Sequence, residues 1–475
     1  MKKTKYSDIV DAINCDIIAN IFQPGHKLLS ITRLSKHYKV SKNTIIRALH
    51  ILESKDKIEA RPKSGFFVKH QVKREQPTAP SFSNIEPSRV MVPELFQDIM
   101  LRGAAFDIMP GEALVFPHAL LRKLHRNINR AVRAQATQKA MYYDEPLGLY
   151  ALREELREHY LSAGVVISVD DVCITSGCQH SLFLGLSATC AKGDNVVIES
   201  PGFYGVIQLL EELGLNAIEV PSHSVSGINI DVLKEVLEKY KITACVVSPA
   251  FATPSGSCMS ELNKQTLIEL ANENDFAIIE DDIYGDLGFN NRPKALKAFD
   301  SDNRVILCSS FSKTLSRDLR VGWVMGARWQ SRIKKLKLVS NLACSQAMQE
   351  ALARFMRDGD YKRHLAYKKN TLLIYRDQLV QALNKHWKGM LKFTIPDGGL
   401  TVWLELDSTI DTRNIYNAAA AKNIIITPGA LFSVAPYFTN FMRLSFNHPT
   451  IENREKAIGR LYSIVGTSKK DAKKR

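Results

Sequence analysis

The chain has 475 residues, which is more than one hydrophobic core accommodates, so two or three domains are expected. Its hydrophobic fraction of 45% and charged fraction of 24% are typical of a globular protein. The N-terminal MKKTKYSDIV lacks the apolar core of a signal peptide, and no apolar run approaches membrane-spanning length, so a cytoplasmic protein without a membrane partner is expected. The eight cysteines are scattered, with no cluster at zinc spacing, so no metal site is expected.

The net charge of +15 is concentrated near the two ends of the chain. Residues 1–75 hold 16 Lys and Arg against 7 Asp and Glu, and residues 469–475 hold five basic residues and one acidic residue. The part between them is therefore close to neutral. A basic N-terminal segment on a neutral body predicts a polyanion-binding module joined to an unrelated domain.

Three short helices are predicted within the first seventy residues. The first has an isoleucine at every fourth position, which indicates one face of an amphipathic helix: Ile9, Ile13, Ile17 and Ile21. A second helix is expected over residues 30–37. Ser41 is a good N-cap for a third helix, whose core positions are Ile45, Ala48, Leu49 and Leu52.

A hairpin is predicted after these helices, with strands at 58–61 and 66–69 around a basic turn. Three helices and a hairpin are typical of a winged helix-turn-helix, whose recognition helix presents its N-terminal residues to the major groove of DNA. The candidate DNA-binding residues are Arg33, Ser41, Lys42, Asn43, Thr44, Arg47, Lys63 and Gly65. The alternative is a small helical domain with a polar cap, because helix-turn-helix patterns also occur in proteins that do not bind DNA.

The stretch PGHKLLSITRLSKHYKVSKNTIIRALHILESKDKIEARPKSGFFV resembles the GntR family of bacterial repressors. The resemblance covers essentially the whole module and implies a winged helix-turn-helix DNA-binding domain over residues 1–70. The usual proline and arginine of the second helix are Leu29 and Thr32 here, although Arg33 is adjacent. It is therefore left open which side chain of that helix contacts the DNA backbone.

Residues 71–93 are expected to form a linker, because four prolines among Ser, Gln and Glu make the segment too polar and proline-rich to pack. The body is expected over residues 94–465, followed by a disordered basic tail at 466–475. Within the body, residues 120–133 predict a basic helix with an apolar stripe at Leu121, Leu124, Ile128 and Val132. A solvated surface helix is favoured there over a second DNA contact.

From about residue 165, short apolar strands alternate with helical segments, and each strand ends in polar, aromatic or small residues. These ends read ESPGFYG from residue 199, SP and then TPSG from 248, EDDIYG from 280, and SSFSKTLSRDLR from 309. Continuous apolar strands that alternate with helices predict a parallel sheet covered on both faces. Because such sheets bind ligands beyond the carboxyl ends of their strands, the four segments predict one binding site.

Pyridoxal 5'-phosphate (PLP) fits this set of side chains. Its aldehyde needs a lysine, its ring nitrogen needs a carboxylate, and its phosphate needs hydroxyls, an arginine and backbone N–H groups at a helix start. Lys313, with neighbouring hydroxyls and Arg320 seven residues later, is the expected attachment point. Taken singly, each residue has an ordinary alternative, such as a surface lysine, a helix cap at Asp281 or a salt bridge at Arg443. Their order and strand-end placement favour the cofactor.

Over residues 105–465 the body resembles the class I/II aminotransferases of fold type I. The resemblance implies an α/β fold with a mostly parallel sheet in a large domain and a small C-terminal α+β domain. It implies catalytic roles for Lys313 at the Schiff base, Asp281 at the ring nitrogen and Tyr284 at the ring hydroxyl, and it places Arg443 at the substrate α-carboxylate. The other implied cofactor-binding residues are Ser310, Ser312 and Arg320 at the phosphate, Ser176, Gly177, Cys178 and Gln179 in the phosphate loop, Phe203 on the ring, and Tyr143, which would reach the phosphate across a dimer interface.

One position departs from that family. Its Asn-Pro-[Thr/Ser]-Gly is Thr253-Pro254-Ser255-Gly256 here, so the asparagine amide that would donate to the ring hydroxyl is missing. Either Thr253 donates with its shorter side chain or the contact is lost. We therefore expect the internal aldimine to titrate unusually.

A GntR-like module followed by an aminotransferase-like body resembles the MocR subfamily of transcriptional regulators. The resemblance implies a homodimer with its N-terminal modules on DNA half-sites, which senses PLP or its external aldimine with an amino-acid or amine effector. The competing hypothesis is an active PLP-dependent aminotransferase that carries a DNA-binding domain, because Lys313, Asp281, Tyr284 and Arg443 are all present. Another reaction of the cofactor, such as decarboxylation, is a third alternative, which Arg443 disfavours.

Overall fold

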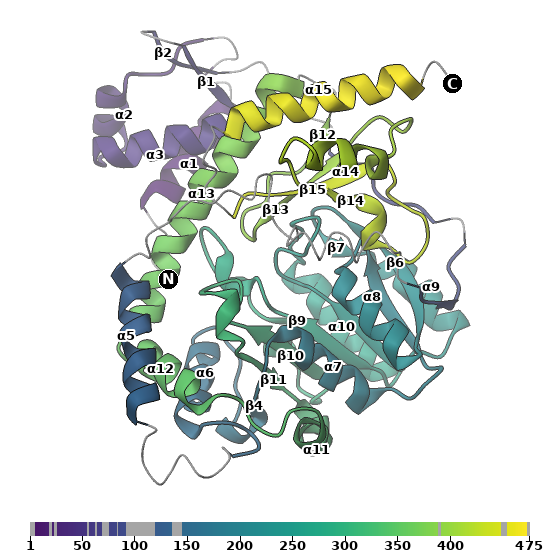
Figure 1. Cartoon of the computed structure of the whole chain (residues 1–475). Coiled ribbons are helices and arrows are strands. Elements are labelled where there is room, and N and C mark those ends of the chain that lie inside the picture. The colour runs from purple at the N-terminus through teal and green to yellow at the C-terminus, as the bar shows by residue number, and fades with distance from the viewer. Residues whose placement is uncertain are drawn as a thin grey trace.

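The computed structural model describes residues 5–18, 21–22, 26–54, 57–61, 64–68, 76–82, 84–91, 119–134, 145–387, 391–447 and 454–472. Figure 1 shows a small N-terminal module, a large domain around a central sheet, and a smaller C-terminal domain. The long helix α13 (Asp360–Trp387) runs past all three parts. The expected combination of a winged helix-turn-helix with a type I α/β fold is confirmed.

The N-terminal module contains the three predicted helices and the hairpin. Its elements are α1 (Lys5–Ile18), α2 (Ile31–His37), α3 (Lys42–Ser54), β1 (Ile58–Arg61) and β2 (Gly65–Val68). Ile13, Ile45 and Leu49 are completely buried, as their helical spacing predicted. Ser41 caps α3, because its Oγ accepts the Thr44 amide N–H at 3.2 Å.

The first helix is shorter than predicted. It ends at Ile18, and Ile21, which was expected on the buried face, is 66% exposed. The amide N–H groups of Ile21 and Phe22 both donate to the Asp16 carbonyl, at 2.9 and 3.2 Å. These bonds turn the chain at the end of the helix, so the four-residue period no longer applies to Ile21.

The large domain is built around a mostly parallel sheet. Within the described residues the strand order is β3-β6-β5-β8-β9-β10-β11-β4, with β7 paired to β6. The neighbours from β6 to β10 are parallel, whereas β11 is antiparallel to both β10 and β4. The strands are β3 (Ser88–Arg89), β4 (Val172–Thr175), β5 (Asn195–Ser200), β6 (Asn216–His223), β7 (Gly227–Ile228), β8 (Ala244–Val247), β9 (Ala277–Asp281), β10 (Val305–Ser310) and β11 (Gly322–Met325).

Helices cover both faces of this sheet (Figure 1), as the apolar strands predicted. Successive strand residues point to opposite faces, so Ile278 packs with α9 and α10, whereas Ile279 packs with α7 and α8. The helices of this domain are α5 (Ala119–Ala134), α6 (Tyr150–Leu161), α7 (Cys178–Thr189), α8 (Tyr204–Leu213), α9 (Ile230–Lys239), α10 (Glu261–Glu273), α11 (Gln330–Ser340) and α12 (Gln346–Arg357).

The small domain is α+β, as expected. Its sheet has the order β12-β13-β15-β14 and is antiparallel throughout. The elements are β12 (Lys392–Phe393), β13 (Thr401–Glu405), α14 (Thr412–Ala420), β14 (Thr427–Pro428), β15 (Phe441–Ser445) and α15 (Arg454–Ala472). Its core is continuous with that of the N-terminal module, since Ile51 of α3 and Leu373 of α13 belong to one buried cluster. The module is therefore packed against the body.

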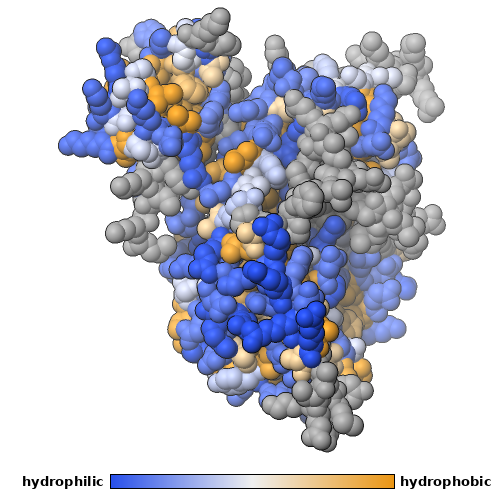
Figure 2. Space-filling model, turned by 60° about the vertical axis from the view of Figure 1, so that its left-hand side comes forward, coloured by the Kyte–Doolittle hydropathy of each residue, from blue (hydrophilic) through white to orange (hydrophobic). Residues whose placement is uncertain are grey.

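The helix α5 forms part of the molecular surface. Its basic outer face is exposed, and Figure 2 shows the side of the molecule on which it lies as largely hydrophilic. Leu124 is buried against α12, as the stripe predicted, but Val132 is 53% exposed. Among the described helices, none is long and apolar enough to cross a bilayer.

Two expectations about the connecting segments are wrong. The described part of residues 71–93 packs on the body, because Phe82 stacks on Tyr437 with ring centroids 4.1 Å apart and Val90 is 3% exposed. Thr78 adds polar contacts, because its amide N–H and its Oγ1 donate to the Glu405 carboxylate at 2.6 and 2.9 Å. The tail expected to be disordered from 466 instead continues α15 as far as Ala472. Lysines and alanine favour helix there, and no proline interrupts it.

Candidate functional site

A cavity of about 300 Å³, here called the cofactor cavity, lies at the carboxyl ends of the central strands. It is lined by Cys178, Gln179, Phe203, Tyr204, Gly205, Gln208, Thr253, Asp281, Ile283, Tyr284, Ser310, Ser312, Lys313 and Arg320. These residues follow β4, β5, β8, β9 and β10. The structure therefore brings together most of the predicted site residues, from separate strand ends, around one space.

Lys313 follows β10 and faces the cofactor cavity. Burial, together with the charges of Arg443 and Arg317, lowers the pKa of Lys313 to about 7, against the opposite effect of Asp281. A substantial fraction of this amine is therefore uncharged near neutral pH. The uncharged form is the one that attacks an aldehyde, so the environment suits covalent capture of a carbonyl group.

Asp281 is the last residue of β9 and is 3% exposed. Burial raises the pKa of Asp281 to about 6, while a hydrogen bond from Cys178 Sγ to its Oδ1, at 3.2 Å, lowers it. The carboxyl group thus remains largely ionised at neutral pH. Tyr284 is equally buried, and burial raises the pKa of its hydroxyl, so it stays protonated. The pair offers one anionic acceptor and one neutral hydroxyl.

The predicted phosphate-binding residues form one corner of the site. Gly177 is the N-cap of α7 with φ of 123°, and a Cβ there would lie 2.9 Å from Arg320 Nη2. That nitrogen donates to the Ser176 carbonyl at 2.8 Å. Arg320 itself has φ of 48°, a left-handed conformation that costs a non-glycine residue energy. A helix start next to a guanidinium makes an anion-binding corner.

Two serines, Ser310 and Ser312, lie beside that corner. The Ser312 amide N–H donates to Ser310 Oγ at 3.3 Å, and both residues line the cavity. Ser176 does not line it, because its Oγ lies 3.0 Å from His180 Nδ1. The backbone carbonyl of Ser176 holds Arg320, and the predicted role of this loop at the phosphate stays a prediction.

Tyr204, Gly205, Gln208 and Ile283 also line the cavity but were not predicted. Tyr204 and Gln208 lie four residues apart in α8 and therefore share a helix face close to Phe203. Gln179 Nε2 donates to the Gly205 carbonyl at 2.7 Å, which joins the starts of α7 and α8. The helical period counted from Tyr204, four residues earlier, is the signal that could have identified Gln208.

Thr253, which replaces the family asparagine, contacts the predicted carboxylate clamp. Arg443 Nη1 donates to Thr253 Oγ1 at 3.2 Å, and its Nη2 donates to Thr427 Oγ1 at 3.1 Å. Arg443 is 2% exposed, with its guanidinium 5.1 Å from the ring centroid of Phe432. Thr253 also hydrogen-bonds Tyr284. The hydroxyl thus links the tyrosine to the arginine, and its effect on a bound cofactor stays a prediction.

Pyridoxal 5'-phosphate fits this donor set. Lys313 would hold the aldehyde, Asp281 would face the ring nitrogen, and Phe203 offers an aromatic wall. At Gly177 the missing Cβ lets the Arg320 guanidinium lie against the start of α7, where it could face an anion. A volume of 300 Å³ lies at the lower end of small-ligand sites.

The predicted DNA-binding residues lie mostly at the surface of the N-terminal module. Arg33, Ser41, Lys42 and Asn43 are exposed, and Gly65 begins β2 with φ of 102°. Thr44 is half-buried, with its Oγ1 2.7 Å from Ser41 Oγ. Lys63 and Tyr143 lie outside the described residues.

Arg47 is a predicted DNA contact that bonds the body. Its Nη2 donates to Oδ1 of Asn370 on α13. Around this bond lies a cavity of about 600 Å³, here called the intermodule cavity. It is lined by Asn43, Ile46, Arg47, His50 and Ile51 of α3 and by Asn370, Leu373, Ile374, Asp377, Gln378 and Gln381 of α13. The predicted base-reading side chain Arg47 is therefore turned toward α13.

Comparisons with known proteins match both parts of the chain. The family described as aminotransferase class I and II matches residues 113–461, and the bacterial regulatory proteins of the gntR family match residues 5–68. The chain is 31% identical to the uncharacterized HTH-type transcriptional regulator YdcR and 30% identical to YjiR, both of Escherichia coli K12, over 97% of this chain and 99% of each relative. It is 31% identical to aromatic-amino-acid aminotransferase 1 of Thermococcus litoralis, over 74% of this chain and 85% of that one.

Solved structures agree with the fold. The multiple substrate aminotransferase of Thermococcus profundus matches with a TM-score of 0.71 at 26% identity, over 80% of this chain and 96% of that chain. The kynurenine aminotransferase of Pyrococcus horikoshii, in complex with PMP, matches with a TM-score of 0.71 at 28% identity, over 79% and 95%. This fold and these neighbours imply a pyridoxal cofactor. The chain belongs to the aminotransferase class I and II family, joined to a gntR-type DNA-binding domain in the arrangement of the MocR-like HTH-type transcriptional regulators.

Proposed function

We propose that this protein is a transcriptional regulator that binds DNA through its N-terminal module, holds PLP in its body and responds to an amino acid or amine. The observation that carries this proposal is the convergence of Lys313, Asp281 and Tyr284 on the cofactor cavity, within a chain whose N-terminal module contains the candidate recognition helix α3. When bound, the cofactor supplies an aldehyde that captures amines and a ring that accepts electrons. Lys313 provides the amine that holds it.

The helix α13 is the structural connection between the two modules. Near its start, His364 Nε2 donates to the Thr314 carbonyl at 2.9 Å, one residue after Lys313, and the Tyr361 hydroxyl donates to Thr314 Oγ1 at 3.2 Å. Two turns later the same helix presents Asn370 to Arg47. A ligand that shifts the segment after Lys313 therefore acts on the helix that contacts α3.

The contact with α13 bears directly on DNA binding. An arginine reads guanine through both of its terminal nitrogens, and a recognition helix needs its base-reading face free to enter the major groove. While α3 lies on α13, the Arg47 side chain is held by Asn370 and faces α13. We infer that DNA binding requires α3 to separate from α13, and that an effector favours one arrangement by binding it more tightly.

A spectroscopic titration tests the sensing function. The cofactor-loaded protein is titrated with a panel of amino acids and amines, its absorbance is recorded, and keto acids are then assayed. A spectral change with one amine and no sustained product supports a sensor. The absence of any cofactor absorbance band, with Lys313 intact, would contradict the proposal at its centre.

The second candidate function is an active aminotransferase. It is favoured by the buried Arg443 beside the cofactor cavity, which can hold a substrate α-carboxylate, and by the 31% identity to the Thermococcus litoralis aminotransferase. Sustained keto-acid production, many times the amount of protein present, would establish this activity. We further propose a cytoplasmic homodimer whose two modules occupy DNA half-sites, which sedimentation with and without operator DNA would check.

The DNA-contact assignment has its own test. Lys42 is exposed at the start of α3 and is expected to contact a phosphate rather than a base. Replacing Lys42 with Ala should weaken binding to all sequences alike and lower the slope of log affinity against log salt by about 1. An unchanged slope in a fluorescence-anisotropy titration would remove Lys42 from the interface.

A further inference from the structure

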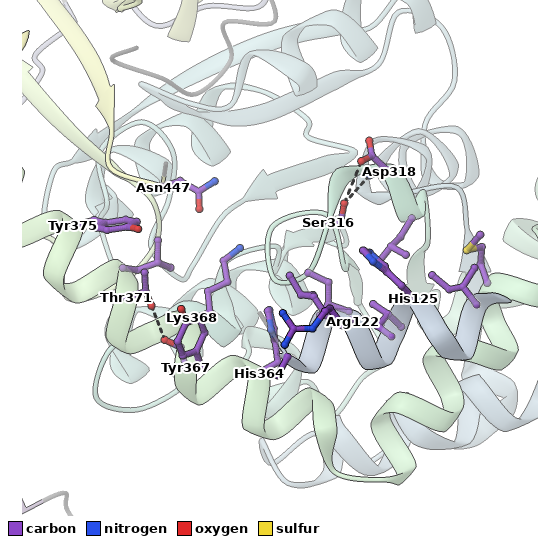
Figure 3. Close-up of a pocket in the computed structure, with 18 residues that line it drawn as sticks. Arg122, His125, Ser316, Asp318, His364, Tyr367, Lys368, Thr371, Tyr375 and Asn447 are labelled. Atoms are coloured by element: carbon purple, nitrogen blue, oxygen red, sulfur yellow. Dashed lines mark hydrogen bonds between the residues drawn. The ribbon is translucent and has the colours of Figure 1, made fainter. Parts of the chain in front are cut away.

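A larger cavity, of about 890 Å³, lies beside the segment that follows Lys313 (Figure 3). It is bounded by α5, by α13, by residues 315–319 and by Asn447. We call it the cationic cavity. It is separate from the cofactor cavity, since no residue lines both of them.

Two cationic side chains, Arg122 and Lys368, line this cavity. The imidazoles of His125 and His364 also line it, and Asp318 is the carboxylate among its described lining residues. Figure 3 shows Lys368, Arg122 and His364 directed toward the same space, whereas Asp318 lies at the opposite rim beside Ser316. The centre of the cavity therefore attracts an anion.

Lys368 is the group that points most clearly to a ligand. Burial lowers the pKa of its ammonium to about 8, so most of it is still charged at neutral pH. Within the described chain, Lys368 has no hydrogen-bond or ion-pair partner. A partly desolvated cation without a partner is unfavourable, and an anion in the cavity would relieve that cost.

The cationic cavity lies close to the segment that carries Lys313. Ser316 lies three residues after Lys313, and the charge of Lys368 is one of the causes that lower the pKa of Lys313. Asn447 lies two residues beyond β15, the strand that carries Arg443. An amine held at Lys313 thus has the cationic cavity close to it.

We propose that the cationic cavity binds a distal anionic group of the effector, with Lys368 as the residue that selects it. The effector class is then an amine or amino acid that carries a second acidic group, a carboxylate or a phosphonate, several atoms from its amine. Tyr367 and Tyr375 provide aromatic walls for the chain between the two groups. The amine end of this assignment rests on the proposed function, whereas the anion site itself does not.

Calorimetric titration of the cofactor-loaded, full-length protein tests the anion site. The probes are glutarate, 4-phosphonobutyrate and pentanoate, which have similar chain lengths but differ in whether the far end carries a charge. None of them has an amine, so binding does not require reaction at Lys313. The variants are Lys368→Met, which removes the charge, and Lys368→Arg, which keeps it. Lys362→Met removes an exposed charge from the same helix and serves as the control.

We expect at least one of the two dianionic probes to bind tenfold or more tightly than pentanoate in the wild type and in Lys362→Met. Lys368→Met should abolish this preference, and Lys368→Arg should restore most of it. A preference for glutarate alone identifies a carboxylate effector, and a preference for 4-phosphonobutyrate alone identifies a phosphonate or phosphate. Equal binding of all three probes to the wild type overturns the proposal, as does a preference that survives in Lys368→Met. If the preference for a dianionic probe is observed but no amine changes the cofactor spectrum, the anion site is supported and the proposed sensing function is contradicted.

Discussion

The cofactor cavity and the cationic cavity are neighbours, but they are built from different kinds of structure. The first collects residues from the ends of five strands in one sheet, and its side chains are fixed by short hydrogen bonds such as that from Cys178 to Asp281. The second lies between two helices, α5 and α13, and its central cation, Lys368, has no described partner. The first is a closely bonded site that fits the cofactor, and the second is a space bordered by a cation without a described partner.

The difference indicates that the two cavities have separate roles. A sheet holds the groups that must keep their geometry during chemistry, because its strand ends are anchored in a packed core. A wall formed by helix faces changes by single side-chain substitutions without disturbing that geometry. We infer that the cofactor chemistry of this chain is fixed by the sheet and that its choice of effector is set by the helices.

The largest effect is expected at Lys313. Replacing Lys313 with Ala should remove the covalent attachment point, so the cofactor-loaded absorbance band should be lost completely. Lys335, an exposed lysine of α11, provides the control, because Lys335→Ala leaves the cofactor cavity untouched. If both variants retained the absorbance band, the cofactor would be attached at a residue other than Lys313. The cofactor cavity would then not be the reactive site that the comparison of the two cavities assumes.

The pH dependence of cofactor capture sharpens the description of the cofactor cavity. The pKa of Lys313 is lowered to about 7, so its amine is mostly charged at pH 6 and mostly uncharged at pH 8. The rate at which cofactor-free protein takes up PLP should therefore rise about tenfold between these values and then level off. Stopped-flow absorbance measures it. A rate that keeps rising toward pH 10 would show an ordinary lysine.

The phosphate corner is expected to be sensitive to a single methyl group. Gly177→Ala would place a Cβ 2.9 Å from Arg320 Nη2, so PLP affinity should fall by about tenfold, equivalent to one hydrogen bond to a charged group. Gly193 is the matched control, because it also has a positive φ, of 89°, but a Cβ there would meet nothing within 4 Å. Equilibrium dialysis of both variants should show weakened binding only for Gly177→Ala.

The smallest predicted effect concerns the contact between the modules. Asn370→Ala removes the acceptor for Arg47 and should release α3, which should raise DNA affinity by about fivefold, the value of one hydrogen bond. Lys385→Ala, in the last turn of α13, is the control, because Lys385 bonds Glu455 instead. Lower DNA affinity in Asn370→Ala would mean that the contact with α13 supports DNA binding.

The two cavities also differ in how far they could be predicted. The positions of Lys313, Asp281 and Tyr284 follow from a short-range rule, because residues after parallel strands meet at one edge of the sheet. No comparable short-range rule predicts that Lys368 lines a cavity. This lysine lies in a 28-residue helix whose faces contact different parts of the protein, so its surroundings depend on how α5, α13 and the segment after β10 pack together.

The N-terminal module shows the same limit. The core positions of α3 and its cap at Ser41 followed from the helical period and from capping chemistry, which are local. The hydrogen bond between Arg47 and Asn370 joins residues more than three hundred positions apart, and no sequence pattern in either segment predicts it. The packing of residues 76–91 was missed for a related reason, since one stacked ring, Phe82 on Tyr437, outweighed an otherwise polar composition.

The two-residue strand β3 has a practical consequence. It pairs Ser88 with Ala217 and Arg89 with Asn216, and so covers the outer side of β6. An uncovered strand edge offers a row of N–H and C=O groups to any other chain and promotes aggregation. A shortened body that starts after residue 75 keeps this cover, whereas one that starts at residue 94 exposes the edge. The segment that connects the DNA-binding module to the body thus also protects the body from aggregation.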